Sequence, residues 1–487
     1  MSRWQPNQKL VVAVVYICGM VMNSLDSTIV NVALATLGRE FDVTPASIES
    51  VVIAYLVSLA VFIPASGWLG DRFGTKRIFL IALAIFTIAS AGCGLAGSLR
   101  QLVLFRIVQG AGGGLLTPVG MAMLYRTFPP QERMAVSRIL MFALIIGPAS
   151  GPIIGGLLIE QLSWRWAFYV NVPVGLAALL FGLLFLREHR EVAPGRFDIP
   201  GFALAGGGFG LVMYALSEGP SHGWRAPEIA GCGVAGALLL ALFVVVELRS
   251  AAPMVQLRLL GNRLFRTTLL VSLSASAGFV GVLFLVPLFL QEARGASPLA
   301  SGLTTFPEAI GVVLSTQIVA RLYPRVGPRR LMAGGLVVVA TGIGLLCLVS
   351  LDSSPWLVRG LMFLIGVGMA YVFLPNQAAS LATISHEATG RASTLFSVQR
   401  QLGAAVGVAI LSSVLGAIGP LRVNDLGATV PNLSAYRAAF LAAAGFATIG
   451  AMIALAIPDR DAAITMQPRA ASPHRWRRRP TPHSASS

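Results

Sequence analysis

The chain has 487 residues, of which 55% are apolar and 11% are charged, and its formal net charge is +16. So much apolar side chain exceeds what one soluble domain can bury, which excludes an ordinary soluble protein. A charge of +16 on a soluble protein would indicate nucleic-acid binding, but here the basic residues lie in short loops between long apolar segments. The composition therefore predicts an integral membrane protein that does not bind nucleic acid.

An α-helix needs roughly 20 mostly apolar residues to cross the bilayer. No cleavage pattern of small residues follows the first apolar segment, so we expect that segment to remain as the first helix. Fourteen transmembrane helices are predicted, and in chain order they cover residues 10–33, 47–70, 77–97, 101–125, 138–160, 166–186, 198–217, 227–247, 267–291, 299–320, 330–350, 356–384, 392–418 and 437–457. An even number of spans places both termini on one side of the membrane.

The distribution of Lys and Arg between alternate loops tests this count, because cytoplasmic loops are rich in basic residues. The loops and termini on the side of the chain ends hold 27 of the 36 basic residues, and those on the opposite side hold eight. We assign Arg106 alone to the interior of a helix. Both termini are therefore expected in the cytoplasm. The excess of Arg over Lys is typical of a GC-rich bacterial genome, so the expected location is the bacterial inner membrane.

The chain ends in a basic tail, residues 459–487, that carries Arg475, Arg477, Arg478 and Arg479. Such a segment can bind anionic lipid headgroups. It can equally be a disordered tail that follows the positive-inside rule. The sequence leaves both interpretations open.

The cysteines and histidines do not predict a metal site. Cys18, Cys93, Cys232 and Cys347 each lie in a long apolar segment, without C-x-x-C spacing or a nearby histidine. We interpret them as small core residues. All five histidines fall in predicted loops or in the tail. No metal and no cofactor are expected.

Two parts of the chain resemble each other. The stretch G-W-L-G-D-R-F-G-T-K-R at 67–77 has a weaker copy, A-R-L-Y-P-R-V-G-P-R-R, at 320–330, and the glycines of the fifth predicted helix recur in the thirteenth. We therefore predict an all-α membrane protein built from two six-helix bundles in parallel orientation, with two inserted helices between them. The expected divisions are 1–186, 187–262 and 263–458, followed by the tail 459–487.

The loop between the second and third predicted helices carries the first recognisable motif. It resembles the signature G-x-L-x-D-R-x-G-x-K-R of the major facilitator superfamily, and across almost the whole chain the sequence is similar to the fourteen-helix drug:proton antiporters of that superfamily. The plain alternative is loop charge that follows the positive-inside rule. An acid that faces helix N-termini in this loop would stabilise one conformer. The resemblance thus implies a conformational latch formed by Gly67, Asp71, Arg72, Gly74, Lys76 and Arg77.

One acid lies inside the first predicted helix, in L-D-S-T-I-V-N-V-A-L at 25–34, which is similar to the first-helix motif of the family. An acid at the bilayer centre costs about 2.5 to 3.5 kcal/mol on insertion scales, so Asp26 needs a partner, a proton or water. Arg106, in the R-x-x-Q-G motif of the fourth helix, falls at a similar depth, so the two side chains can pair. Two interpretations stay open: a structural salt bridge, and coupling to protons when the pair opens.

The fifth predicted helix contains G-P-A-S-G-P-I-I-G-G at 147–156. Its small residues allow close helix packing, and its prolines bend the helix. The segment resembles a motif associated with antiporters of the superfamily and usually absent from its symporters, which implies an exporter that this packing seals in one state. The residues of this antiporter-like motif are Gly147, Pro148, Gly151, Pro152, Gly155 and Gly156.

A second embedded acid, Glu308, lies near the bilayer midplane in the tenth predicted helix. An acid at that depth is a functional candidate. If it faces a cavity, it favours a cationic substrate or a second proton site; if it faces a neighbouring helix, it bonds to Ser or Thr. The second half departs from the first at two positions: Pro324 mirrors Asp71, and Val282 mirrors Asp26. The expected proton site is therefore asymmetric.

The resemblance implies proton-coupled efflux of small lipophilic, cationic drugs or toxic compounds by alternating access, with Asp26, Arg106 and Glu308 in proton coupling. A dedicated exporter of one metabolite, such as an antibiotic or siderophore, is the alternative, and the motifs do not separate the two. An intramembrane enzyme would need paired acids, H-E-x-x-H or a nucleophile motif, none of which the sequence contains. The expected partners are the substrate, protons and membrane lipids, and the expected state is a monomer.

Overall fold

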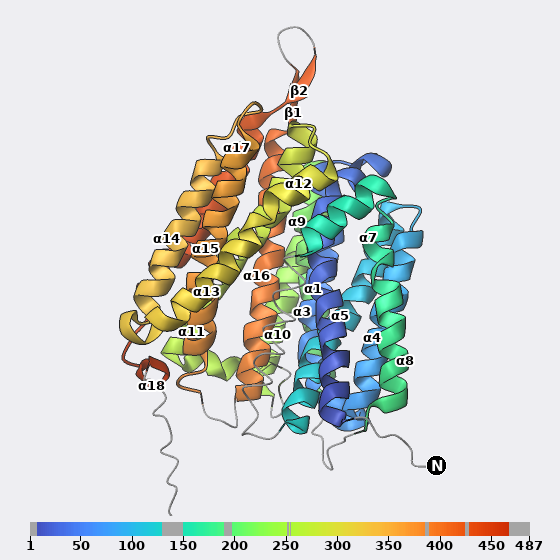
Figure 1. The fold of residues 1–487 in the computed structure, drawn as a ribbon, viewed down its shortest axis with the longest axis vertical. Helices are drawn as coiled ribbons and strands as arrows, with labels where there is room; N and C mark the ends of the chain where they lie inside the picture. Colours follow the sequence, from blue (N-terminus) through green and yellow to red (C-terminus); the bar gives the residue numbers. More distant parts are fainter. Residues whose placement is uncertain are drawn as a thin grey trace, which may run out of the picture.

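The computed structural model describes residues 7–128, 150–188, 197–250, 253, 255–384, 389–423 and 428–466. These residues form an almost entirely helical molecule (Figure 1). The β-structure among them is a hairpin of β1 (Leu421–Val423) and β2 (Thr429–Pro431), whose strands pair antiparallel. The hairpin lies at one end of the molecule, and the beginning of α1 and the short helix α18 lie at the other (Figure 1). We call these the hairpin end and the termini end.

Long apolar helices connect the two ends, because in a bilayer every backbone N–H and C=O has to bond within its own segment. In chain order, with the short helices included, the first helices are α1 (Gln8–Glu40), α2 (Pro45–Ile48), α3 (Ser50–Phe73), α4 (Thr75–Leu95), α5 (Leu99–Thr127), a helix over residues 150–161, α7 (Trp166–Tyr169) and α8 (Asn171–Phe185). Next are α9 (Ile199–His222), α10 (Pro227–Arg249) and η2 (Leu257–Gly261). The last are α11 (Arg263–Leu288), η3 (Phe289–Ala293), α12 (Pro298–Thr305), α13 (Pro307–Val326), α14 (Pro328–Leu346), α15 (Pro355–Ser380), α16 (Thr389–Ile418), α17 (Leu433–Ala454) and α18 (Ala463–Met466).

Thirteen helices among the described residues are long and apolar enough to cross a membrane. They match thirteen of the fourteen predicted spans. The remaining span, 138–160, lies partly outside the described residues, and its described part is helical from residue 150. The predicted tenth span is divided into α12 and α13 at Phe306, because Pro307 has no N–H with which to continue the hydrogen bonding of α12.

The helices pack in two groups that repeat one pattern. In the first group α5 packs on α3 and α4, and α8 packs on α1 and α4. In the second group α15 packs on α13 and α14, and α17 packs on α11 and α14. Each pair in the first group has a counterpart in the second, which is the arrangement expected of a parallel repeat.

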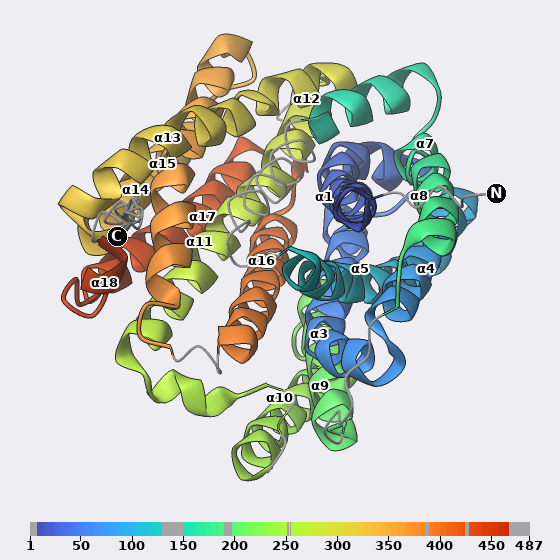
Figure 2. The same cartoon turned by 60° about the horizontal axis from the view of Figure 1, so that its bottom comes forward.

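The inserted helices α9 and α10 pack along each other at the edge of the assembly (Figure 2). Helix α9 also contacts α3 of the first group and α16 of the second. Helix α10 carries exposed apolar side chains, among them Val234, Leu238 and Leu242. Such a surface suits contact with lipid, whose tails are as apolar as leucine.

One sequence assignment is wrong. Arg106 is not alone within a helix, because Arg400 lies about three turns inside α16. The stretch Ser397–Gln401 is mostly polar, so in sequence it resembles the end of a loop. The predicted span 392–418 already contains this stretch, and in the structure the helix runs through it, which places Arg400 inside the helix rather than in the loop.

Helices α13 and α15 approach each other closely at Gly366 of α15, so a substitution there tests their packing. A Cβ atom added at Gly366 would overlap the backbone of Glu308 on α13, whereas one added at Gly360 on the same helix would meet nothing within 4 Å. We predict that Gly366→Ala destabilises the protein by about 1 to 3 kcal/mol, as overpacking does elsewhere. Gly360→Ala should be neutral or slightly stabilising, because alanine favours a helix. Thermal unfolding in detergent compares them, and equal unfolding temperatures would contradict this packing.

Candidate functional site

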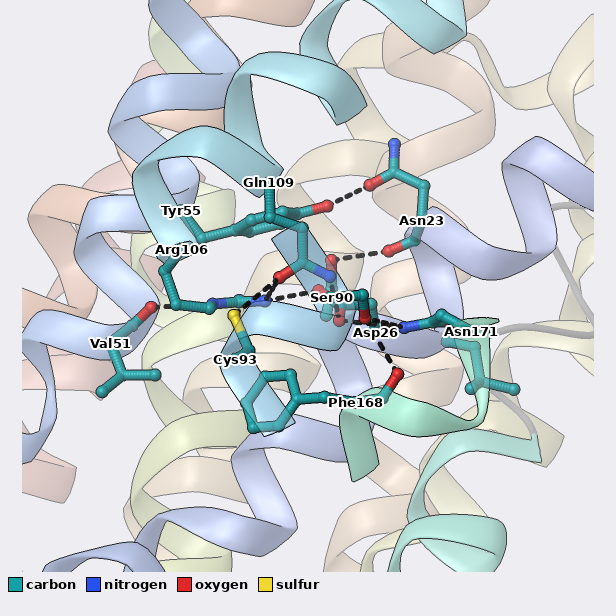
Figure 3. Close-up of polar contacts among 12 residues, drawn as sticks. Asn23, Asp26, Val51, Tyr55, Ser90, Cys93, Arg106, Gln109, Phe168 and Asn171 are labelled. Atoms are coloured by element: carbon teal, nitrogen blue, oxygen red, sulfur yellow. Dashed lines mark hydrogen bonds and ion pairs between the residues drawn. The ribbon is translucent and has the colours of Figure 1, made fainter. Parts of the chain in front are cut away.

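Asp26 lies at the centre of a buried polar network in the first group of helices (Figure 3). Its Oδ2 accepts a 2.5 Å hydrogen bond from Arg106 Nη1. Its Oδ1 accepts hydrogen bonds from Gln109 Nε2 at 2.8 Å and from Asn171 Nδ2 at 3.2 Å. All these neighbours donate, which suits an ionised carboxylate, because that group can only accept.

Arg106 is enclosed as completely as its partner, with 1% of its side chain exposed. Its Nε donates to Val51 O at 3.1 Å, and its Nη1 also donates to Gln109 Oε1 at 2.8 Å. The guanidinium carbon lies 4.0 Å from the centre of the Tyr55 ring. These contacts offset part of the cost of removing the guanidinium from water.

Further side chains extend the network to other helices. Asn171 Nδ2 also donates to Ser90 Oγ at 3.1 Å, and the Ser90 hydroxyl donates to Phe168 O at 2.9 Å. The Tyr55 hydroxyl donates to Asn23 Oδ1 on α1. Side chains or backbone of α1, α3, α4, α5, α7 and α8 thus meet in one connected group of polar atoms (Figure 3).

The sequence predicted that Asp26 and Arg106 can pair, and they do; their role in proton coupling stays a prediction. The sequence analysis did not identify Gln109 and Asn171 as partners of Asp26. Gln109 lies one turn after Arg106, so its place on the same helix face was a usable signal. Asn171 is distant from both in sequence, and only the packing of α8 on α1 and α4 brings it to Asp26.

The described part of the antiporter-like motif lies in the helix over residues 150–161, while Gly147 and Pro148 fall outside the described residues. A Cβ atom at Gly151 would overlap Thr28 of α1, and Gly155 packs on the next residue of α1. This helix therefore touches α1 almost backbone to backbone, as the small residues predict.

The same helix also contacts the second group at the hairpin end. A Cβ atom at Gly156 would lie 2.6 Å from Leu299 Cα on α12, and one at Gly302 would overlap the carbonyl of Pro152. Glu160 Oε2 accepts a 3.2 Å hydrogen bond from Leu299 N. The two groups of helices are thus closed against each other at these residues of the hairpin end.

In the predicted latch, Asp71 pairs with a residue that the sequence analysis did not select. Its Oδ1 lies 3.0 Å from Arg126 Nη2, at the termini end of α3 and α5. Asp71 therefore does not face the N-terminus of a helix, as the sequence analysis expected. It lies in the last turn of α3, which continues to Phe73. Gly67 has open space around it, and Arg72 is exposed.

The acid at the N-terminus of α4 is Glu188, which follows α8. Its Oε1 accepts from Lys76 N at 3.0 Å, and its Oε2 accepts from Arg77 N at 3.3 Å. A carboxylate at this position is favoured by the unpaired N–H groups and the dipole of the helix. Gly74 has a φ of 102°, and a Cβ atom there would overlap the Glu188 carboxylate, so both backbone and space require glycine.

Glu308 is 8% exposed in the first turn of α13. Within the described residues no hydrogen bond or ion pair holds its carboxyl group, so the bond to Ser or Thr that the sequence left open is not seen there. Burying an ionised carboxylate without a partner is costly. This side chain is therefore the second candidate for binding a proton or a cation.

Metal ligands do not cluster in the part of the chain that the structure describes: no three His, Cys, Asp or Glu side chains there are placed to hold an ion. All four cysteines are free thiols. Cys93 lies beside the network, with its Sγ 3.6 Å from Gln109 Oε1.

A double-mutant cycle tests the energetic coupling of the central pair. Removing one partner of a buried ion pair typically costs about 3 to 5 kcal/mol, because the other charge is left uncompensated. We predict that Asp26→Asn and Arg106→Gln each lower the unfolding temperature, and that the double variant loses clearly less than both single losses together. Arg165→Gln, which breaks a surface pair with Glu40 at 3.4 Å, is the control and should cost about 1 kcal/mol or less. Strictly additive losses at the central pair would contradict the coupling.

Comparisons with known proteins show which family this architecture belongs to. The sequence profile of the Major Facilitator Superfamily matches residues 16–408. The chain is 34% identical over 406 residues to the Multidrug resistance protein B homolog of Mycobacterium tuberculosis, which covers 82% of this chain and 75% of that protein. It is 33% identical over 413 residues to the Putative multidrug resistance protein MdtD of Salmonella paratyphi A, with 83% and 86% covered.

Two solved structures share the fold. A bacterial homolog of the human lysosomal transporter Spinster, in an inward-facing and unoccupied conformation, has a TM-score of 0.64 at 17% identity, with 96% of this chain and 100% of that chain covered. The nucleoside transporter NupG has a TM-score of 0.63 at 15% identity, with 93% and 100% covered. The all-α membrane fold predicted from the sequence is confirmed, and the chain belongs to the major facilitator superfamily.

Proposed function

We propose that the protein exports small lipophilic, cationic compounds from the cytoplasm in exchange for protons, by alternating access between its two groups of helices. The observation that carries this proposal is the buried carboxylate of Asp26, a charge that a proton can neutralise inside a membrane transporter. The names of the relatives, which are multidrug resistance proteins, support drugs as the substrate class.

The contacts of Asp26 depend on its charge. A proton on either oxygen would displace an accepted hydrogen bond, because the neighbours there are donors, and would weaken the attraction to Arg106. The network would then have different free energies in the protonated and ionised forms, and that difference would bias the equilibrium between conformers. A membrane potential of 100 mV adds roughly 2.3 kcal/mol per charge that crosses. A purely structural salt bridge would make the same contacts but would not respond to a proton gradient.

The closed hairpin end supports an assignment of the conformer. Gln291 Nε2 donates to Val32 O across the two groups at 2.8 Å, in addition to the close contact of Gly156 with Leu299. With both termini in the cytoplasm, as the basic loops predict, this end faces outward. The conformer is then closed to the outside, and opening this end would be the step that lets an external proton reach Asp26.

The ion pair of Asp71 with Arg126 fits a conformational latch rather than a stabilising bond. Both side chains are partly exposed, so the pair adds about 1 kcal/mol or less to stability. An energy of that size still matters for two conformers that differ by only a few kcal/mol. The pair joins α3 and α5 at the proposed cytoplasmic end.

Glu308 supports a cationic substrate, because it offers a buried negative charge in the second group without a protein partner among the described residues. The same machinery would serve a dedicated exporter of one metabolite. Transport of chemically diverse cations would separate a multidrug exporter from such a specialist.

Proton coupling is tested in proteoliposomes with an imposed proton gradient. We expect the wild type to accumulate a lipophilic cation against its gradient, and Asp26→Asn to lose at least about tenfold of this uptake, since one lost charge-assisted bond is worth about 1.5 to 3 kcal/mol. Exchange of labelled for unlabelled substrate needs no proton and should survive. Asp352→Asn, which changes an exposed acid in the loop before α15, is the control. Gradient-driven uptake by Asp26→Asn equal to wild type would refute the proton role.

The substrate role of Glu308 is tested by comparing monovalent with divalent lipophilic cations. Glu308→Gln removes one negative charge at constant shape, so transport of the divalent cation should fall more than that of the monovalent one. Glu228→Gln, an exposed acid in the first turn of α10, should change neither. If Glu308→Gln leaves both cations equally well transported, Glu308 is structural.

A further inference from the structure

Arg400 is a basic residue inside a membrane span. Unlike Arg106, which pairs with Asp26, it has no carboxylate partner among the described residues. Its side chain is exposed, about three turns into α16. Within the described residues no hydrogen bond holds it either. An arginine inside the hydrocarbon core is costly unless it faces water or a partner. Arg400 therefore needs a hydrated space or an anion.

The residue belongs to a polar stripe on the termini-end half of α16. We define the polar stripe as Ser393, Ser397, Arg400 and Gln401, whose spacing of four, three and one residues puts them on one helix face. All four are exposed or partly exposed, although they lie within a helix that spans the membrane.

The other face of this half-helix fixes the direction of the polar stripe. Ala392 and Leu395 are buried in an apolar cluster with Phe243 of α10 and Phe265 of α11. The polar stripe therefore points away from the inserted helices. Figure 2 shows α16 in the middle of the assembly, with α11 and α17 on one side and α3 and α5 on the other. The stripe thus faces the interior between the two groups rather than lipid.

The internal repeat indicates that the fold itself does not require this charge. Gly403 of α16 matches Gly147 of the fifth predicted helix, and the same offset places Leu144 where α16 has Arg400. The sequence of the first half thus has an apolar residue at the equivalent position. Arg400 is better explained by a ligand than by packing.

We propose that Arg400 and the polar stripe bind the anionic group of the transported substrate, a carboxylate on an amphipathic molecule. This inference rests on the proposed transport function, and it extends the substrate class from cations to zwitterions. A guanidinium holds a carboxylate through two parallel N–H donors, and the hydroxyl of Ser397 and the amide of Gln401 add neutral donors on the same face. Arg106 is not available for this task, because it is enclosed and its Nη1 already donates to Asp26 and Gln109.

The test is a binding measurement on the full-length protein in detergent, by fluorescence polarisation. The probes are rhodamine B and its ethyl ester, which share one cationic ring system and differ by a free carboxylate. Arg400→Gln should weaken binding of rhodamine B about tenfold and binding of the ester less than about twofold. Arg400→Lys keeps the charge without the fork of donors, so an intermediate loss confined to rhodamine B is expected. Arg391→Gln, an exposed residue in the first turn of α16, is the control and should bind both probes like the wild type.

Equal losses for both probes, no loss at all, or failure of the wild type to bind rhodamine B would each overturn the proposal. So would a difference between the probes that disappears when phosphatidylglycerol is added, because the anion would then be a lipid headgroup. Circular dichroism confirms folding, and Arg400→Lys carries the test if the glutamine variant does not fold. Transport of both probes is measured separately in proteoliposomes: a wild type that binds both probes but carries neither overturns the transport function and not the binding site.

Discussion

The structure depends on one electrostatic constraint, which is that a charge buried inside a bilayer-spanning bundle has to be neutralised where it lies. Asp26 and Arg106 meet this constraint for each other, and Gln109 and Asn171 donate to the other oxygen of the carboxylate. Each partner comes from a different helix or a different turn, so the network also fixes how those helices pack. A bundle that separated α1 from α5 would have to expose or neutralise both charges.

Embedded charges in the two groups of helices differ in how they are satisfied. In the first group the pair is enclosed, and its carboxylate is bonded at both oxygens. In the second group Glu308 and Arg400 have no such partners among the described residues. A fully bonded network makes the surrounding packing rigid, whereas an unsatisfied charge is free to bind an ion or a substrate. Val282 and Pro324 already show in the sequence that the two halves differ in their charged residues. The structure adds that the embedded charges without a partner among the described residues, Glu308 and Arg400, lie in the second group.

Glycine packing explains how such a bundle can have two states. At the hairpin end Gly156 and Gly302 let the backbones of the two groups touch. In the proposed alternating access, contacts of this kind would be made or lost together, because a packed interface is bistable rather than continuously deformable. At the other end, Asp71 and Arg126 add a weak ion pair between neighbouring helices. The two ends thus offer separate points at which one conformer can be favoured.

The sequence by itself determined the membrane class, the spans and the pairing of Asp26 with Arg106. It could do so because the bilayer fixes helix length and penalises isolated charge, and both rules act on local sequence. The tertiary structure alone decided which donors complete the carboxylate and that Glu188 rather than Asp71 caps α4. Asn171 and Glu188 lie far along the chain from their partners, so no local pattern encodes these contacts. Packing also decided which face of α16 is left exposed, because Ala392 and Leu395 are buried against Phe243 and Phe265 of other helices.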